Sequence, residues 1–130
     1  MVQTGRQEIK GNIKARYMIT STCNAEHYTW GNGCDGWHLL KTDTLSVIQE
    51  RMPPGTSEQM HFHERAQQVF YILFGIATFE IEGEVVTVNA SQSLHISPGI
   101  GHRISNNSNI DLHFLVISQP KAHGDRVNIG

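Results

Sequence analysis

The most informative stretch of this chain is residues 55–75, Gly55-Thr-Ser-Glu-Gln-Met-His61-Phe-His63-Glu-Arg-Ala-Gln-Gln68-Val-Phe-Tyr-Ile-Leu-Phe-Gly75. His61 and His63 stand two residues apart in a segment expected to form a strand. Because successive side chains of a strand point to opposite faces, these two imidazoles point the same way. Gln68 begins the next expected strand after a short turn. Its side-chain oxygen can approach the same point, so the stretch predicts a metal site.

A further ligand has to come from elsewhere in the chain. His102 follows the turn Pro98-Gly99-Ile100-Gly101 and begins a later expected strand. Two alternatives stay open at this point. Gln67 or Glu64 replaces Gln68 if the turn after His63 is tighter than expected. Gln68 either binds the metal directly or holds a water molecule on a three-histidine site.

The first stretch resembles the first motif of the cupin superfamily, G-x5-H-x-H-x(3,4)-E-x6-G. Gly55, His61, His63 and Gly75 fall in register, and Gln68 stands at the glutamate position. The second cupin motif, G-x5-P-x-G-x2-H-x3-N, is matched at three positions, Gly99, His102 and Asn106. Ser91 and Ser97 replace its first glycine and its proline, and Pro98 follows one residue later. The resemblance covers about residues 44–118.

This resemblance implies an all-β fold, the double-stranded β-helix (jelly-roll) barrel of cupins. It also implies one divalent transition metal per chain (Ni, Zn, Fe, Mn or Cu), bound by four side chains, His61, His63, Gln68 and His102. Small cupins are often homodimers, in which an N-terminal strand extends the sheet of the partner. The segment 13–20 is expected to serve that role here, because an added strand satisfies an open sheet edge.

Short β-rich runs alternate with turns from Trp37 onward, as in all-β barrels and sandwiches. The expected strands are 37–41, 44–52, 58–63, 67–74, 76–82, 85–89, 93–97, 101–105 and 111–118. No segment keeps an apolar period of about 3.6 residues, so little helix is expected. The chain divides into an N-terminal segment (1–36), which pairs with a partner subunit in this reading, a barrel (37–120) and a polar tail (121–130). The tail is either frayed or folded over the barrel mouth.

Composition excludes several classes of function. Charged residues make up 17% of the chain and the formal net charge is −2, unlike the basic surface of a nucleic-acid-binding protein. The N-terminus lacks a signal-peptide pattern, and the longest apolar run, 69–79, is shorter than the roughly 20 residues of a membrane span. We therefore expect a cytoplasmic protein without nucleic-acid or membrane partners, with Cys23 and Cys34 as free thiols.

Four other residues are candidates for the site. Gln49 and Arg51 share one face of an expected strand, and Arg51 either clamps a substrate carboxylate or lies solvated on the outer face. Tyr71 is expected to pack in the core or to line the mouth of the pocket. His95 is either an acid–base residue near the metal or a hydrogen-bonded core histidine. The sequence assigns Gln49, Arg51 and Tyr71 to substrate binding and His95 to catalysis.

Glutamine in place of glutamate points to a function. A neutral ligand leaves the full +2 charge of the metal, which favours anionic substrates and Lewis-acid chemistry. The ligand set resembles that of certain non-redox cupins, so we expect a metal-dependent enzyme for isomerisation, cyclisation or elimination on a small polar or anionic molecule. The alternatives are a cupin dioxygenase and a non-catalytic module that binds or senses a small ligand. An acid–base residue beside the metal would favour the metal-dependent isomerase, cyclase or lyase. A pocket lined only by apolar groups would favour the dioxygenase or the binding module.

Overall fold

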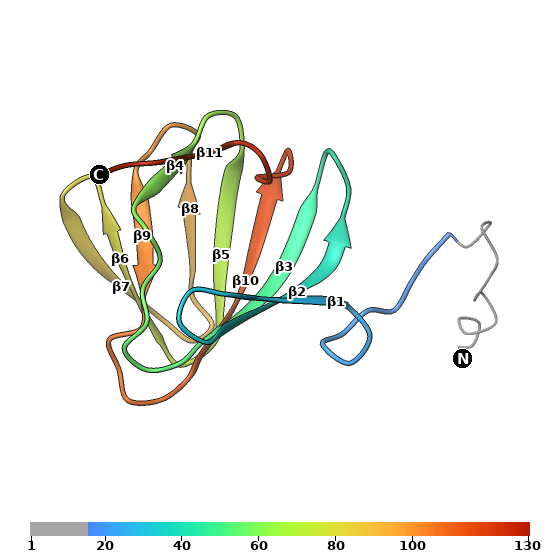
Figure 1. Ribbon diagram of the computed structural model, residues 1–130, viewed down its shortest axis with the longest axis horizontal. Helices are drawn as coiled ribbons and strands as arrows, with labels where there is room; N and C mark the ends of the chain where they lie inside the picture. The colour runs from blue at the N-terminus through green and yellow to red at the C-terminus, as the bar shows by residue number, and fades with distance from the viewer. Residues whose placement is uncertain (1–15) are drawn as a thin grey trace.

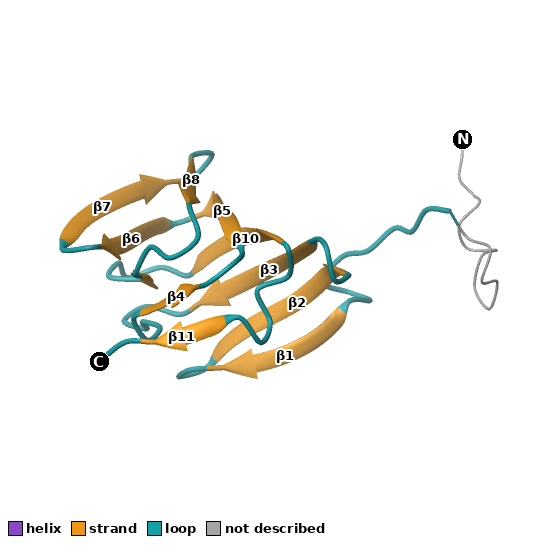
Figure 2. Ribbon diagram, turned by 90° about the horizontal axis from the view of Figure 1, so that it is seen from above, coloured by secondary structure: helices purple, strands orange, loops and turns teal. Residues whose placement is uncertain are grey.

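The computed structural model describes residues 16–130, and these residues form two antiparallel sheets that face each other (Figure 1). The strands are β1 (Glu26–Trp30), β2 (Cys34–Lys41), β3 (Ser46–Met52), β4 (His61–His63), β5 (Gln67–Phe74), β6 (Ile76–Ile81), β7 (Glu84–Asn89), β8 (Ser93–Ile96), β9 (His102–Ser105), β10 (Leu112–Gln119) and β11 (Arg126–Asn128). One sheet has the order β1-β2-β3-β10-β5-β8, and the other β11-β4-β9-β6-β7. The described residues contain no helix (Figure 2), which confirms the all-β, double-stranded β-helix fold.

Inward-facing side chains change character along the central strands. In β3, Ser46, Ile48 and Glu50 line a cavity, whereas Met52 lies in the apolar core. The same change runs along β5, from Gln68 through Phe70 to Ile72. In β10 the order is reversed, from Phe114 in the core to Ser118 at the cavity, because the strand is antiparallel to both neighbours. One end of the barrel is therefore a packed hydrophobic core, and the other end is polar and hollow.

Two glycine positions in the expected turns have a clear structural role. Glu82 and Gly83 both have positive φ, 48° and 87°, and they form the tight hairpin turn between β6 and β7. Gly75 has a φ of 90°, and a Cβ atom there would lie 2.5 Å from the carbonyl oxygen of Asp111. The last glycine of the first motif is thus required by backbone conformation and by close packing against β10.

The N-terminal and C-terminal parts differ from expectation. The predicted strand at 13–20 begins outside the described residues, and residues 16–20 form no strand. Instead β1 forms a hairpin with β2 inside the same chain, so the first sheet begins well before residue 37. Short strands with few apolar residues, such as EHYTW at 26–30, carry little periodic signal. The sequence therefore predicts turns rather than a strand over residues 24–36.

The polar tail docks on the barrel. β11 pairs with β4, with Arg126 opposite His63 and Asn128 opposite His61. The carboxylate of buried Asp125 accepts hydrogen bonds from the backbone N–H groups of Glu64, Arg65 and Ala66 at 2.9 to 3.2 Å. The tail thereby ties down the turn between β4 and β5. None of residues 16–130 lies in a helix capable of crossing a membrane.

Candidate metal centre

Three histidines gather where β4 meets β9. β4 carries His61 and His63, and His102 begins β9 directly opposite His61. The ring centroids lie 4.5 Å apart for His61 and His102, 5.0 Å for His61 and His63, and 6.2 Å for His63 and His102. All three side chains are buried. The H-x-H spacing and the pairing of β4 with β9 thus bring together three residues predicted from the two motifs.

Hydrogen bonds to carbonyl groups orient two of these rings. His61 Nδ1 lies 2.8 Å from the carbonyl oxygen of Gln59, and His102 Nδ1 lies 2.9 Å from that of Ile100. A carbonyl oxygen only accepts, so each Nδ1 carries the proton and each Nε2 keeps a free lone pair. The same outer hydrogen bond sets the tautomer of histidines that bind metals in proteins.

The environment keeps the imidazoles neutral. Burial, opposed in part by the hydrogen bond to Gln59, lowers the pKa of His61 to about 3. Burial and the neighbouring His102 lower the pKa of His63 to about 4. The pKa of His102 is also lowered, chiefly by burial. At neutral pH all three rings are therefore unprotonated, which is the state that binds a metal.

Gln68 presents an oxygen atom at the same end of the barrel. It faces inward at the start of β5, where its Nε2 donates a hydrogen bond to Ser118 Oγ at 3.0 Å. Its Oε1 is buried and has no hydrogen-bond partner among the described residues. His102 Nε2 and His63 Nδ1 are likewise buried without a partner there. Buried polar atoms are almost always satisfied, so this set of unpaired atoms fits a cation-binding site.

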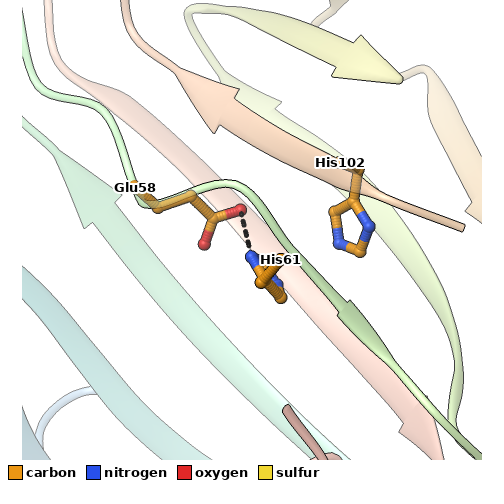
Figure 3. Close-up of side chains that lie close together, drawn as sticks. All are labelled: Glu58, His61 and His102. Carbon is orange, nitrogen blue, oxygen red and sulfur yellow. Dashed lines mark ion pairs between the residues drawn. The ribbon is translucent and has the colours of Figure 1, made fainter. Parts of the chain in front are cut away.

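Glu58 is a neighbour of the cluster that sequence reasoning missed. Side-chain ligand atoms of Glu58, His61 and His102 all lie within 4.8 Å of one another (Figure 3). Its Oε2 lies 3.9 Å from His61 Nδ1 and accepts a hydrogen bond from the backbone N–H of Ile104 at 3.1 Å. Burial, and then the charge of Glu50, raise the pKa of Glu58 to about 8. Glu58 thus lies on the Nδ1 side of His61, beyond hydrogen-bond distance of the ring. In the sequence, the position of Glu58 before the H-x-H pair carries no signal that its side chain is buried.

A cavity of about 880 Å³ opens beside the histidines. His61, His63 and Gln68 line it, together with side chains from β1, β2, β3 and β10 and from residues 121–126. Its walls carry several ionisable groups, Glu26, Tyr28, His38, Lys41, Asp43, Glu50, Glu58, Lys121, His123 and Arg126. The walls also carry apolar side chains, those of Trp30, Ile48, Phe70, Ile104 and Val116. The pocket therefore combines apolar surface with ionisable groups, and it is not the purely apolar pocket expected of simple apolar binding.

The residues expected to bind substrate from β3 lie elsewhere. Gln49 and Arg51 are absent from the cavity lining, whereas Ile48 and Glu50 belong to it. Arg51 donates to Asp35 at 2.7 Å and to Asp111 at 3.2 Å on the outer face of the sheet. Because side chains alternate along a strand, a difference of one residue decides which face a side chain occupies. Of the two expectations for Arg51, the outer-face position is the one observed.

Tyr71 and His95 also lie outside the cavity lining. Tyr71 alternates with the core residues Phe70 and Ile72 and faces the other way. His95 is exposed, and its Nε2 lies 2.9 Å from Gln67 Oε1. Gln67 is itself exposed and also donates to Gln119 at 2.7 Å. We therefore leave Tyr71 and His95 out of the proposed site. Glu64 and Gln67 are exposed, so Gln68 is the one of the three open alternatives that faces the histidines.

The fold and the histidine cluster define a double-stranded β-helix protein with a candidate metal centre. The chain belongs to the cupin family, since the cupin domain model matches residues 48–118, more than half of its length. A curated relative, the oxalate-binding protein of Thermotoga maritima, is 36% identical over 85 residues, which are 62% of this chain and 70% of the relative.

Solved structures agree with this assignment. The structure of a predicted oxalate decarboxylase from Thermotoga maritima superposes with a TM-score of 0.73 at 25% identity, covering 80% of this chain and 100% of the other. The polyketide cyclase RemF from Streptomyces resistomycificus superposes with a TM-score of 0.77 at 16% identity, covering 88% and 86%. The second likeness shows the common fold alone.

Proposed function

We propose that this cupin is a metal-dependent enzyme acting on a small polar or anionic molecule by isomerisation, cyclisation or elimination. His61, His63, Gln68 and His102 hold one divalent transition metal. The observation that carries this proposal is the set of unpaired buried atoms on His63, Gln68 and His102, beside a cavity with ionisable walls. When bound, the metal supplies a Lewis acid that polarises a carbonyl or hydroxyl oxygen. The surrounding side chains then bind the molecule, exclude water and move a proton.

The composition of the cavity favours this reading over a dioxygenase. Gln68 departs from the geometry of two histidines and one carboxylate that is typical of non-haem iron oxygenases. Glu50 and Glu58 line the pocket, and burial keeps the pKa of each above the usual range, at about 7 and about 8. Carboxyl groups that titrate near neutral pH are suited to proton transfer.

A second candidate function is non-catalytic binding of a small dicarboxylate. It is favoured by the name of the curated relative, an oxalate-binding protein. The same four side chains would hold the metal, and the dicarboxylate would bind to it as the final ligand. Turnover of any substrate by the metal-loaded protein, at a rate that metal removal abolishes, would separate the enzyme from the binding module.

The purified protein is expected to carry close to one divalent ion per chain. Three neutral imidazoles and one amide oxygen provide four donors that are already buried and oriented. Elemental analysis of untagged protein from metal-replete medium measures this ratio and identifies the metal. Only trace metal in such a preparation would contradict the proposal.

Gln68→Glu is expected to bind the metal more tightly and small carboxylates more weakly. The substitution is nearly isosteric and places a negative charge where Oε1 is unpaired. The hydroxyl group of Ser118, now an acceptor for Gln68 Nε2, can turn to donate to the carboxylate. We expect a change of about tenfold in each direction, measured by titration with Zn²⁺ and, for the zinc-loaded protein, with oxalate.

The Gln68→Glu experiment has a matched control variant and an outcome that would contradict direct ligation by Gln68. Gln67→Glu makes the same chemical change one residue earlier, on the outer face of β5, and should alter neither affinity. If Gln68→Glu leaves both affinities unchanged, Gln68 does not touch the metal and the site is a three-histidine one.

The chain is expected to be a homodimer in solution. Tyr17, Met18 and Ile19 form a consecutive apolar run with exposed fractions of 58%, 77% and 71%, and this run leads away from the barrel (Figure 1). β1 is the edge of the six-stranded sheet and has one unpaired side. Both features are normally covered by a partner. Light scattering should give twice 14.6 kDa at micromolar concentration. The double variant Met18→Asp, Ile19→Asp should give a monomer, and a monomeric wild type would refute the proposal.

A further inference from the structure

Tyr28 and Glu50 form a hydrogen-bonded pair inside the cavity, and neither residue is among the proposed metal ligands. The Tyr28 hydroxyl donates to Glu50 Oε2 at 3.0 Å, and both side chains line the same cavity as His61, His63 and Gln68. Tyr28 and Glu50 come from β1 and β3, in the sheet opposite the histidine strands β4 and β9 (Figure 1). A molecule held at the histidine cluster would therefore have this pair on its other side.

The backbone is built to allow this pair. Tyr28, Gly36 and Glu50 occupy one cross-strand row, because Tyr28 is opposite Gly36 and Gly36 is opposite Glu50. A Cβ atom on Gly36 would lie 2.1 Å from Tyr28 Cζ and 2.5 Å from its hydroxyl oxygen. The tyrosine ring thus crosses the middle strand where the side chain is missing, and only a glycine there lets the hydroxyl group reach Glu50.

Glu50 makes fewer contacts than Glu58, the other carboxyl group of the cavity whose pKa is raised. Glu58 has one oxygen on the Ile104 N–H and near His61, and the other 3.9 Å from Arg126 Nη1. Glu50 accepts a hydrogen bond only from Tyr28 among the described residues, and only at Oε2. Its Oε1 is therefore available to a bound molecule, whereas both oxygens of Glu58 have neighbours, the Ile104 N–H at one and Arg126 at the other.

We propose that Glu50 is the catalytic acid–base residue of the cavity and that Tyr28, through its hydrogen bond, is its positioning residue. This assignment rests on the proposed function. The Glu50 carboxylate takes a proton from a carbon next to a carbonyl group. The electron pair of the broken C–H bond forms a C=C double bond, and the π electron pair of the carbonyl group moves onto its oxygen to give an enolate. Return of the proton to another atom of the same molecule completes an isomerisation. No oxidant or second reactant is needed.

The electrostatic setting of Glu50 agrees with this role. Burial raises the pKa of Glu50 to about 7, while the hydrogen bond from Tyr28 and the charge of Arg126 act in the opposite direction. Cys34 of β2 and Glu58 are the other titratable groups that interact with it. A carboxyl group with this pKa exists in both protonation states near neutral pH, as an acid–base residue requires.

The first measurement tests the pair without metal or substrate. Carbon NMR of protein labelled at the glutamate carboxyl carbons follows each titration, and the signal lost in Glu50→Gln belongs to Glu50. Its midpoint should lie near pH 7 and should rise in Tyr28→Phe and in Gly36→Ala, because each removes a hydrogen bond to the charged form. Glu80→Gln is the matched control, since Glu80 pairs with Arg103 on the outer face of β6. A midpoint that neither substitution moves would overturn the proposal.

The second measurement tests the proton transfer. Zinc-loaded protein is mixed with pyruvate in D₂O, and exchange of the methyl protons is followed by proton NMR. Wild type should accelerate exchange, Glu50→Gln should slow it at least 100-fold, and Tyr28→Phe and Gly36→Ala should slow it about tenfold. Glu80→Gln should match wild type. All variants should keep the same zinc content.

The outcomes separate the two proposals. Exchange by zinc-loaded Glu50→Gln at the wild-type rate overturns the role of Glu50 and leaves the proposed function standing. No exchange above the zinc-free background in wild type overturns both the metal-assisted proton transfer and the role of Glu50, whatever the first measurement gives.

Discussion

His61→Ala and His102→Ala are each expected to lose the metal, with affinity lowered by more than about 100-fold, because even the outer-shell partners of a metal ligand contribute 10- to 100-fold. His61 and His102 are direct partners across β4 and β9, and their rings lie 4.5 Å apart. Removing either ring takes away one donor and leaves a cavity beside the remaining two. Elemental analysis after dialysis against a weak chelator measures the loss.

The loss of metal also lowers the stability of the fold. A ligand present at about 100 times its Kd contributes roughly 2.7 kcal/mol to the folded state, and a site that no longer binds forfeits that amount. Thermal unfolding should therefore show a metal-dependent midpoint for wild type and a metal-independent one for His61→Ala and His102→Ala.

His27→Ala is the matched control for both measurements. His27 is exposed on β1, and its Nε2 lies 2.8 Å from Asp35 Oδ1 on the outer face of the sheet. It should keep the wild-type metal content and the metal-dependent midpoint. Equal metal in all three variants would remove the basis for the proposed centre.

Asp125→Ala is expected to lower the free energy of unfolding by about 3 kcal/mol or more. Its carboxylate accepts hydrogen bonds from three consecutive backbone N–H groups, those of Glu64, Arg65 and Ala66. Alanine leaves the N–H groups of Arg65 and Ala66 without an acceptor, whereas the N–H group of Glu64 keeps the backbone carbonyl of residue 125 at 3.3 Å. Each unsatisfied buried group costs roughly 1–3 kcal/mol. Some of the amides can recover a hydrogen bond to water, so the total stays near the lower end of that sum. Urea unfolding measures the change.

The same substitution should weaken the metal centre at a distance. Asp125 anchors the segment that leads into β11, and β11 pairs with His61 and His63 of β4. In Asp125→Ala, the amide hydrogens of residues 64–66 should exchange faster, and titration should show a lower affinity for zinc. Asp43→Ala is the control, because Asp43 is exposed and pairs only with Lys121 at 2.9 Å. If Asp125→Ala is as stable as Asp43→Ala, the carboxylate does not hold the tail.

Local spacing and the two motifs predicted the fold class, which the structure confirms, whereas the set of metal ligands stays a prediction. The alternation of side chains along a strand placed His61 and His63 on one face, and the turn glycines placed the ends of several strands. The expected strands at 67–74 and 93–97 agree closely with β5 and β8. These properties depend on residues near one another in the chain, so a short stretch of sequence carries them.

The tertiary structure decided which face of a sheet each side chain occupies and which distant strands lie side by side. Gln49 and Arg51 were expected beside the substrate, but the register of β3 against β2 and β10 turns Glu50 inward in their place. His95 likewise faces solvent because its strand lies at the edge of the sheet with its even-numbered residues inward.

The sequence alone determined the double-stranded β-helix, through the two cupin motifs, and the motif positions of His61, His63 and His102. These features are local, because they depend on spacing along one strand and on the residues around each turn. Only the tertiary structure decided that Tyr28 reaches Glu50 over Gly36, that Glu58 lies beside His61 and that Asp125 ties the tail to the turn after β4. Each of these contacts joins residues from different elements. Their meeting depends on sheet order and register, which are set by the packing of the whole barrel and leave no periodic signal in any one segment.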